Sequence, residues 1–262
     1  MGITSVMAGA EPWSAEGSGD RARVGVAVIH GFTGNPVSTR PVGERLNAEG
    51  WTVEVPRLPG HGTSWMDLSR TRFGDWRRVV DETIDSLAER CDKVVVVGLS
   101  MGGTLTLDAA TRRPADLAAI AVINATILPR DGLLPKLLPV LQFLLPVTPR
   151  DLADMPTGDI AKEGGDERAY GLVPTMTAYS IVKAQDEIRG RLDRLTMPVL
   201  VAWSPQDHTV PPKNSEWLAE QLADRDLTTV RCERSYHVVT LDHDAELLND
   251  ALVDFVARTT DS

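Results

Sequence analysis

Residues 94–103 read VVVVGLSMGG, a run of β-branched residues that leads into a Gly-x-Ser-x-Gly turn. Helical spacing of apolar residues follows until Pro114, so the stretch predicts a buried strand, a sharp turn and a helix. A serine in such a turn needs small residues two positions before and after it, because a Cβ there would collide with the nearby backbone. Gly98 and Gly102 meet this requirement, which makes Ser100 a candidate nucleophile. The alternative interpretation is a plain connection between a strand and a helix.

The composition of the chain excludes several classes of protein. A length of 262 residues, 42% of them hydrophobic and 24% charged, suits one large α/β domain with or without an inserted subdomain. The net charge of −10 argues against a nucleic-acid partner, because such a partner needs a dense cationic face. Cys91 and Cys232 lie far apart in sequence and indicate neither a disulfide framework nor a metal site. The N-terminus lacks the pattern of a secretory signal, so we expect a cytoplasmic protein.

Strands and helices are expected to alternate along most of the chain. Continuous or alternating apolar runs indicate strands, and apolar residues spaced three and four apart indicate helices. The expected strands are 24–29, 51–55, 94–97, 117–123, 198–203 and 227–232, and the expected helices are 39–49, 74–90, 214–222 and a last one that contains Leu248. This alternation is typical of βαβ units, so we predict an α/β fold with a mostly parallel, doubly wound sheet. Residues 1–22 predict a loose arm or an edge strand.

The alternation fails between residues 125 and 190, where seven prolines interrupt a leucine-rich region. We predict that this region is a cap inserted between two parts of the core, residues 1–124 and 191–262. The run at 133–147 is too broken by proline to cross a bilayer, which takes about 20 apolar residues. Its leucines could form the core of a small helical subdomain, and any surplus could line an acyl site or contact a lipid surface transiently.

A serine hydroxyl needs a base within hydrogen-bond reach, and histidine is the side chain whose reference pKa lies near neutral pH. The candidate base is His237, because it follows the expected strand 227–232 and functional side chains gather at the carboxyl ends of parallel strands. His243 lies at the entrance to the last helix, where a surface residue is the simpler interpretation, and His30 begins a glycine-rich loop. The remaining histidines are His61, in another glycine-rich loop, and His208.

The acid that orients this base should follow another strand, between Ser100 and His237 in sequence. Asp207 is placed in this way, in the loop after the expected strand 198–203. An isolated aspartate in a proline-rich loop is more often a turn residue, and the position in the strand order is what favours an acid here. Asp242 is the second choice, but its position just before the last helix is typical of a helix cap.

An oxyanion hole needs two N–H donors, one from the residue after the nucleophile and one from the loop after an early strand. These would be the backbone N–H groups of Met101 and Phe32. Gly31 and Gly34 give the second loop the freedom to turn an amide inward, although glycines at these positions would also suit a simple turn.

The order Ser100, Asp207, His237, with HGFTG at residues 30–34, resembles the α/β-hydrolase fold over nearly the whole chain. More narrowly, the strings GFTGNP, PGHGT, GLSMGG and SYHVVTLD resemble those of small bacterial carboxylesterases and monoacylglycerol lipases. The resemblance implies Ser100 as nucleophile, His237 as base and Asp207 as orienting acid, with Phe32 and Met101 as oxyanion donors. It also implies a cap that shields an apolar groove for the acyl chain.

The sequence therefore predicts a serine ester hydrolase that uses no cofactor or metal and works through an acyl-enzyme on monoacylglycerols or on short to medium acyl esters. The partner is a small-molecule ester, and the chain could be a monomer or a homodimer. Other reactions of the same three residues stay open, namely those of a C–C bond hydrolase, a thioesterase or a perhydrolase. A non-catalytic binding relative is a further alternative, but such a relative would be expected to have lost one of the three residues.

Overall fold

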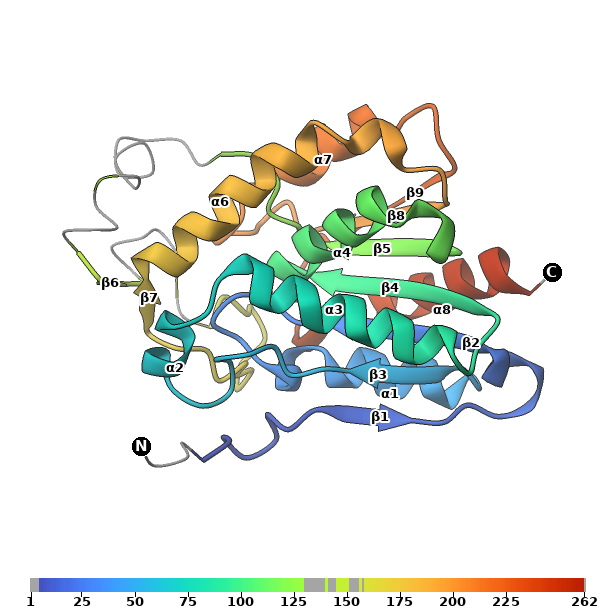
Figure 1. Cartoon of the computed structure of the whole chain (residues 1–262), viewed down its shortest axis with the longest axis horizontal. Helices are drawn as coiled ribbons and strands as arrows, with labels where there is room; N and C mark the ends of the chain where they lie inside the picture. The colour runs from blue at the N-terminus through green and yellow to red at the C-terminus, as the bar shows by residue number, and fades with distance from the viewer. Residues whose placement is uncertain (1–4, 130–139, 141–144, 151–155, 157, 262) are drawn as a thin grey trace.

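The computed structural model describes residues 5–129, 140, 145–150, 156 and 158–261, and within them a central sheet organises the chain (Figure 1). The sheet has seven strands in the order β1-β3-β2-β4-β5-β8-β9, and only β1, at one edge, runs antiparallel to its neighbour. The strands are β1 (Trp13–Ala15), β2 (Val24–Ile29), β3 (Thr52–Val55), β4 (Lys93–Leu99), β5 (Ala119–Ile123), β8 (Val199–Trp203) and β9 (Leu227–Arg231). The α/β prediction of a mostly parallel, doubly wound sheet is thereby confirmed.

Helices cover both faces of the sheet because its central strands are apolar on both sides. In β4, Val94 and Val96 belong to one buried cluster, and Val95 and Val97 belong to the other. Helices that contribute to the first cluster include α3 (Phe73–Ala88), α4 (Met101–Arg112), α6 (Thr175–Arg189) and α7 (Lys213–Gln221), and α1 (Arg40–Ala48) and α8 (Ala245–Thr260) contribute to the second. The sheet is therefore the middle of three layers.

The expected strands and helices lie close to their predicted positions, and the N-terminal segment supplies the edge strand β1. The short helix α2 (Trp65–Ser69) was missed, since five residues are too few to show helical spacing. It begins at Ser64, whose side chain accepts a hydrogen bond from the N–H of Asp67. Short 3₁₀ turns complete the described elements: η1 (Gly19–Arg23), η2 (Pro36–Ser38), η3 (Pro114–Asp116), η5 (Leu192–Arg194) and η6 (Val239–Leu241).

The region predicted as a cap is described only in part. The leucine-rich run at 133–147 lies mostly outside the described residues. The described remainder holds a small antiparallel sheet of β6 (Val147–Pro149) and β7 (Leu172–Pro174), followed by α6, which packs into the core beside α4. None of the described helices is long and apolar enough to cross a membrane.

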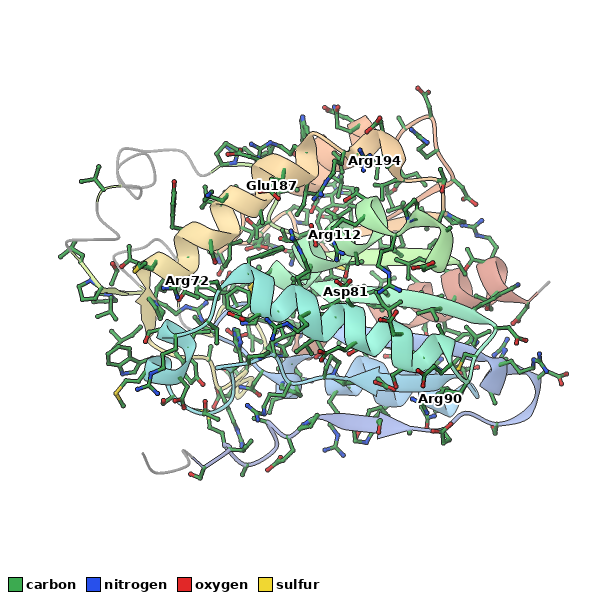
Figure 2. All side chains as sticks on the ribbon, viewed as in Figure 1. Arg72, Asp81, Arg90, Arg112, Glu187 and Arg194 are labelled. Carbon is green, nitrogen blue, oxygen red and sulfur yellow. The ribbon has the colours of Figure 1, made fainter. Side chains whose placement is uncertain are left out.

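A buried carboxylate ties the helices of one face together. Asp108 of α4 is fully buried. Its carboxylate accepts hydrogen bonds from Arg77 of α3 at 2.8 Å, Arg112 at 2.9 Å and Arg191 at 3.0 Å. Arg112 also reaches Asp81 of α3 at 2.8 Å, and Figure 2 shows these two side chains facing each other between α4 and α3. Because a buried charge is costly without partners, this network fixes α3 and α4 against one another.

Candidate active site

The turn between β4 and α4 holds Ser100 in a strained backbone conformation. Its φ is 58° and its ψ is −119°, and its N–H donates to the carbonyl of Ile123 at 2.8 Å. A Cβ on Gly98 would lie 2.2 Å from the carbonyl oxygen of Gly102, and one on Gly102 would lie 2.1 Å from that of Ile29. Such approaches are far closer than any side chain tolerates. The turn therefore has the backbone geometry of a nucleophile elbow, in which crowding requires both glycines.

The glycine-rich loop after β2 lies directly against the elbow. A Cβ on Gly31 would stand 3.1 Å from the Cβ of Ser100. The N–H groups of Phe32, in this loop, and of Met101, at the start of α4, donate to no protein atom in the described part of the chain. Free N–H groups on both sides of a serine suit an oxyanion hole, and the assignment of Phe32 and Met101 to that role stays a prediction.

His30, which begins this loop, and His61, whose ring contacts Phe32 of the loop, are both buried. Burial lowers the pKa of His30 to about 4. Its Nε2 accepts from the N–H of Leu58 at 3.1 Å, and its Nδ1 lies 2.9 Å from the carbonyl oxygen of Gly31. Burial likewise lowers the pKa of His61, whose ring meets those of His30 and Phe32 edge-on. Both ring nitrogens of His30, and Nδ1 of His61, face backbone groups, so these rings support the loop.

Asp207 and His237 are in direct contact after β8 and β9. The distance from His237 Nδ1 to Asp207 Oδ2 is 2.7 Å, and both side chains are almost fully buried. The other carboxylate oxygen accepts the N–H groups of Thr209 at 2.8 Å and Val210 at 2.7 Å. Asp207 is therefore held in place by its own loop while its other oxygen accepts a hydrogen bond from the His237 Nδ1–H. A ring that carries its proton on Nδ1 leaves Nε2 as the basic nitrogen.

The charges around His237 favour its protonated form. Burial is the largest single influence and lowers the pKa of His237, but the carboxylates of Asp207, Glu167 and Asp159 together outweigh it, with Asp207 contributing most of the three. The pKa of His237 therefore lies above its ordinary value. A ring with these neighbours is a stronger base toward a nearby hydroxyl than an isolated imidazole.

The turn that holds Ser100 and the Asp207–His237 pair both lie at the carboxyl edge of the sheet. β4 pairs with β5, and β5 pairs with β8, so Ser100 and Asp207 follow strands on either side of β5. Although both side chains are described, no hydrogen bond joins Ser100 Oγ to His237. Contacts of this kind are often long before substrate binds.

One interpretation from the sequence needs correction. Asp242 is not a helix cap: α8 begins after Asp244, and the Asp242 carboxylate accepts the N–H groups of Ala161 at 2.8 Å and Tyr236 at 2.8 Å. It therefore joins Ala161 of the predicted cap region to the loop that carries His237. Local sequence could not show this, because the partner lies 81 residues away.

A second carboxylate makes a similar junction. Asp159, which is buried, accepts the N–H of His208 at 3.0 Å and the hydroxyl of Thr209 at 3.1 Å, and its side chain meets His208 Nδ1 at 2.9 Å. Its own carbonyl accepts the N–H of Val238 at 3.1 Å. Asp159 thus contacts the residues that follow both Asp207 and His237.

Two buried charged residues near the glycine-rich loop were also missed. Arg150 donates to Thr33 Oγ1 at 2.8 Å and lies 3.6 Å from Glu167 Oε1. Burial raises the pKa of Glu167, although Arg150 and His237 counteract part of this effect. The stretch that contains both residues is rich in charges, so nothing in the sequence distinguishes this pair from a solvated one.

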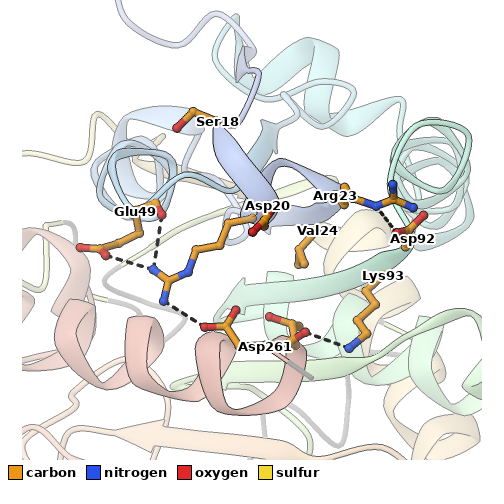
Figure 3. A pocket seen from close by; sticks show the side chains of 10 residues that line it. Ser18, Asp20, Arg23, Val24, Glu49, Asp92, Lys93 and Asp261 are labelled. Atoms are coloured by element: carbon orange, nitrogen blue, oxygen red, sulfur yellow. Dashed lines mark hydrogen bonds and ion pairs between the residues drawn. The ribbon is translucent and has the colours of Figure 1, made fainter.

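A hollow of the described structure lies elsewhere. Its volume is about 710 Å³, and it opens at the other edge of the sheet, between the starts of β2 and β4 and the end of α8 (Figure 3). Arg21 pairs there with Glu49 at 3.3 Å and Asp261 at 3.0 Å, and Lys93 donates to the carbonyl of Thr260 at 2.8 Å. The hollow holds no nucleophile with a base. In the described parts of the chain, no cluster of histidine, cysteine and acidic residues could hold a metal ion.

Comparison with known proteins identifies the family. Residues 20–244 match the family described as serine aminopeptidase, S33. The chain belongs to this family. A family relative from a Bacillus species, a thermostable monoacylglycerol lipase, is 36% identical over 97% of this chain and 96% of its own. A carboxylesterase from Bacillus subtilis is 24% identical over 95% of this chain and 96% of its own.

Solved structures agree with this family assignment. One, from work on two metagenome-derived lipolytic enzymes, superposes with a TM-score of 0.86 at 35% identity, covering 97% of this chain and all of the other. A Paleococcus ferrophilus monoacylglycerol lipase shares the fold, with a TM-score of 0.79 at 20% identity over 95% of this chain and 100% of its own. The predictions of an α/β-hydrolase and of a carboxylic ester hydrolase are therefore confirmed.

Proposed function

We propose that this ester hydrolase works through Ser100 as nucleophile, His237 as general base and Asp207 as the acid that orients the ring. The observation that carries the proposal is the 2.7 Å contact between His237 Nδ1 and Asp207 Oδ2 at the sheet edge that also bears the elbow. Nucleophilic acyl transfer requires a serine and an oriented imidazole, and both follow strands at this edge of the sheet.

In the first half of the reaction, His237 Nε2 takes the proton of the Ser100 hydroxyl while Oγ bonds to the ester carbonyl carbon. The carbonyl oxygen becomes an oxyanion, which accepts hydrogen bonds from the N–H groups of Phe32 and Met101. His237 then gives its proton to the alcohol oxygen as the bond from that oxygen to the carbonyl carbon breaks. The alcohol leaves, and the acyl group stays on Ser100.

Water completes the cycle by the same steps. His237 removes a proton from a water molecule as the water oxygen bonds to the acyl carbon, and the same N–H groups bind the new oxyanion. The proton then passes to Ser100 Oγ as the acyl bond breaks, which releases the carboxylic acid. Every group that these steps need belongs to the chain or to the substrate, so the reaction requires no cofactor or metal.

We propose monoacylglycerols and short to medium acyl esters as the substrates. The support is the monoacylglycerol lipase that is 36% identical over 97% of this chain. Residues 125–190 would form the cap over the acyl chain. The described part of this region already contacts the site, because Arg150 meets the glycine-rich loop and Asp159 meets the loops of Asp207 and His237.

A panel of substrates tests this assignment. Monoacylglycerols of increasing chain length are compared with di- and triacylglycerols, simple esters, thioesters and C–C substrates. We expect turnover of monoacylglycerols and esters, and addition of one phosphonyl group, seen by intact mass, after treatment with a fluorophosphonate. Ser100→Ala should stay unlabelled. Turnover confined to thioesters or C–C substrates would contradict the ester assignment, and an unlabelled wild-type protein would favour a binding protein.

Transient contact with a lipid surface is the second part of the proposal. Large apolar side chains are exposed where α2, β6, β7 and the start of α6 gather at one end of the molecule (Figure 1). Met66 is 54% exposed, Leu145 47% and Met176 40%. Exposed apolar groups of this size on adjoining elements suit adsorption to a lipid surface.

Vesicle flotation measures this contact. Wild-type protein should rise with phosphatidylcholine vesicles, and the Met66→Ser, Met176→Ser double variant should rise less. Leu247→Ser is the matched control, because Leu247 is 48% exposed but lies on α8. Equal flotation of both variants would refute a lipid contact at this end of the molecule.

A further inference from the structure

Asn124 stands directly after β5 in a conformation that side chains rarely adopt. Its φ is 45°, and only 2% of its surface is exposed. Asparagine tolerates this left-handed region better than most residues, but a buried non-glycine residue there still indicates a constraint from its surroundings. β5 lies between β4, which leads to Ser100, and β8, which leads to Asp207.

The side chain of Asn124 bridges two loops of the site. Its Oδ1 accepts the N–H of Ser204 at 2.9 Å, and its Nδ2 donates to the carbonyl of His237 at 2.7 Å. Ser204 begins the loop that carries Asp207, and its hydroxyl donates to the carbonyl of Ser235, two residues before His237. Both polar atoms of the amide therefore make hydrogen bonds, the oxygen to the loop that carries Asp207 and the nitrogen to the backbone of His237.

The backbone around Asn124 also contacts the turn that holds Ser100. The carbonyl of the preceding residue, Ile123, accepts the N–H of Ser100 at 2.8 Å. The N–H of Asn124 itself donates to the carbonyl of Ala202 in β8 at 2.9 Å. Ile123 and Asn124 thus contact the turn that holds Ser100, the loop that carries Asp207 and the backbone of His237.

We propose that Asn124 is a positioning residue, which sets the place of His237 relative to Ser100 by binding the His237 carbonyl to the end of β5. The proposal rests on the proposed function, since it assumes that His237 acts on Ser100. Asn124 need not touch the substrate for this role. It acts through the backbone of His237, and proton transfer between the ring and Ser100 is sensitive to small displacements.

Three substitutions separate the parts of this role. Asn124→Ala removes both side-chain bonds and keeps the strained backbone. Asn124→Gly also removes both bonds, but glycine adopts a φ of 45° readily, so this variant relieves the strain. Asn124→Asp keeps an acceptor for the Ser204 N–H and places an oxygen, in place of the donor, against the His237 carbonyl.

Asn214→Ala is the matched control. Asn214 is also buried; its Oδ1 accepts the N–H groups of Ile127 at 2.9 Å and Leu128 at 2.7 Å, and its Nδ2 donates to the carbonyl of Pro211 at 2.9 Å. Its side chain makes three hydrogen bonds, one more than that of Asn124, but none to His237. Its loss should lower the unfolding temperature and leave kcat near the wild-type value.

We expect all three Asn124 variants to lower kcat on a simple ester by about 10²-fold, the cost of misplacing a reacting group by about 1 Å, with KM nearly unchanged. Wild-type kcat in Asn124→Gly would mean that the residue only accommodates the turn and would overturn the proposal. Wild-type kcat in Asn124→Asp would also overturn it, because that variant lacks the donor. So would a loss of kcat in the control equal to that in Asn124→Ala.

A readout without substrate keeps this proposal separate from the proposed function. The Nδ1 proton between His237 and Asp207 gives a downfield proton NMR signal, which should shift or broaden in Asn124→Gly and stay in place in Asn214→Ala. If the wild-type protein hydrolyses no ester but the signal responds, the proposed function fails and the positioning of the ring by Asn124 stands. If esters are hydrolysed and neither kcat nor the signal changes, the positioning role fails alone.

Discussion

The two edges of the central sheet differ in how they hold their polar groups. At the carboxyl edge, Thr33, Ser100 and Asn124 follow successive strand ends with positive φ angles, and Asp207 and His237 are buried in contact. At the opposite edge, the hollow of Figure 3 is lined by charged side chains that pair with one another near solvent. Backbone strain and buried polar contacts persist only where the surrounding structure enforces them. The carboxyl edge therefore holds strained backbone and buried polar contacts. The opposite edge holds exposed ion pairs, which contribute little to stability.

The largest effect is expected from Ser100→Ala. Removal of the proposed nucleophile should lower kcat on a simple ester by on the order of 10⁶-fold. The turn itself does not depend on the hydroxyl, because its shape comes from Gly98 and Gly102. Circular dichroism should therefore show an unchanged unfolding temperature. A variant that kept substantial activity would place the nucleophile elsewhere.

Asp207→Asn should have the next largest effect. The amide oxygen could still accept the N–H groups of Thr209 and Val210, so the loop should stay folded. The amide nitrogen would then face His237 Nδ1 as a donor and drive the ring proton to Nε2, which removes the base. The precedent for this exchange of tautomers is a loss of about 10⁴-fold in kcat. A loss confined to KM would instead make Asp207 a substrate contact.

Those two effects concern residues that the sequence itself singled out, and the reason is a simple rule of parallel sheets. The side chains that face the site follow the carboxyl ends of strands, and apolar runs made those strands visible in the sequence. Asn124 obeys the same rule, since it follows the expected strand 117–123, and a search for polar residues at each strand end would have found it. What the sequence could not show is its bond to the His237 carbonyl, 113 residues away.

The contacts of the cap region could not be predicted from the sequence, for the same physical reason. Asp242 has the local sequence of a helix cap, and only the fold brings it to Ala161. Arg150 and Glu167 are ordinary charges in sequence, and their burial depends on how the glycine-rich loop packs against them. Strand and helix patterns are local, whereas these ion pairs and junctions depend on long-range packing.

A smaller effect is expected on the pH dependence of kcat/KM, and it should distinguish a carboxylate near His237 from one far from it. His237 must be neutral to act as the base, and its pKa is raised, so kcat/KM should fall as the pH drops through a value above the reference of about 6.5. Asp159 helps to raise this pKa. Asp159→Asn should therefore move the acid limb to lower pH and leave kcat/KM at high pH unchanged.

The control for that shift is Asp92→Asn, which removes the same charge from the opposite edge of the sheet, where Asp92 is exposed beside Arg23. Its pH profile should overlay that of the wild type, because solvent and salt screen exposed charges at long range. Equal shifts in both variants would mean that the total charge of the protein, rather than the contacts of the site, sets the pKa of His237.

The smallest effect is expected from Arg23→Gln. Asp92 raises the pKa of Arg23 through a direct hydrogen bond, but the side chain of Arg23 is 71% exposed, so water replaces most of what the pair contributes. Both kcat/KM and the unfolding temperature should match those of the wild type within the error of the measurements, at low salt and at high salt. A clear loss of activity would show that the hollow communicates with the carboxyl edge and would break the distinction between the two edges.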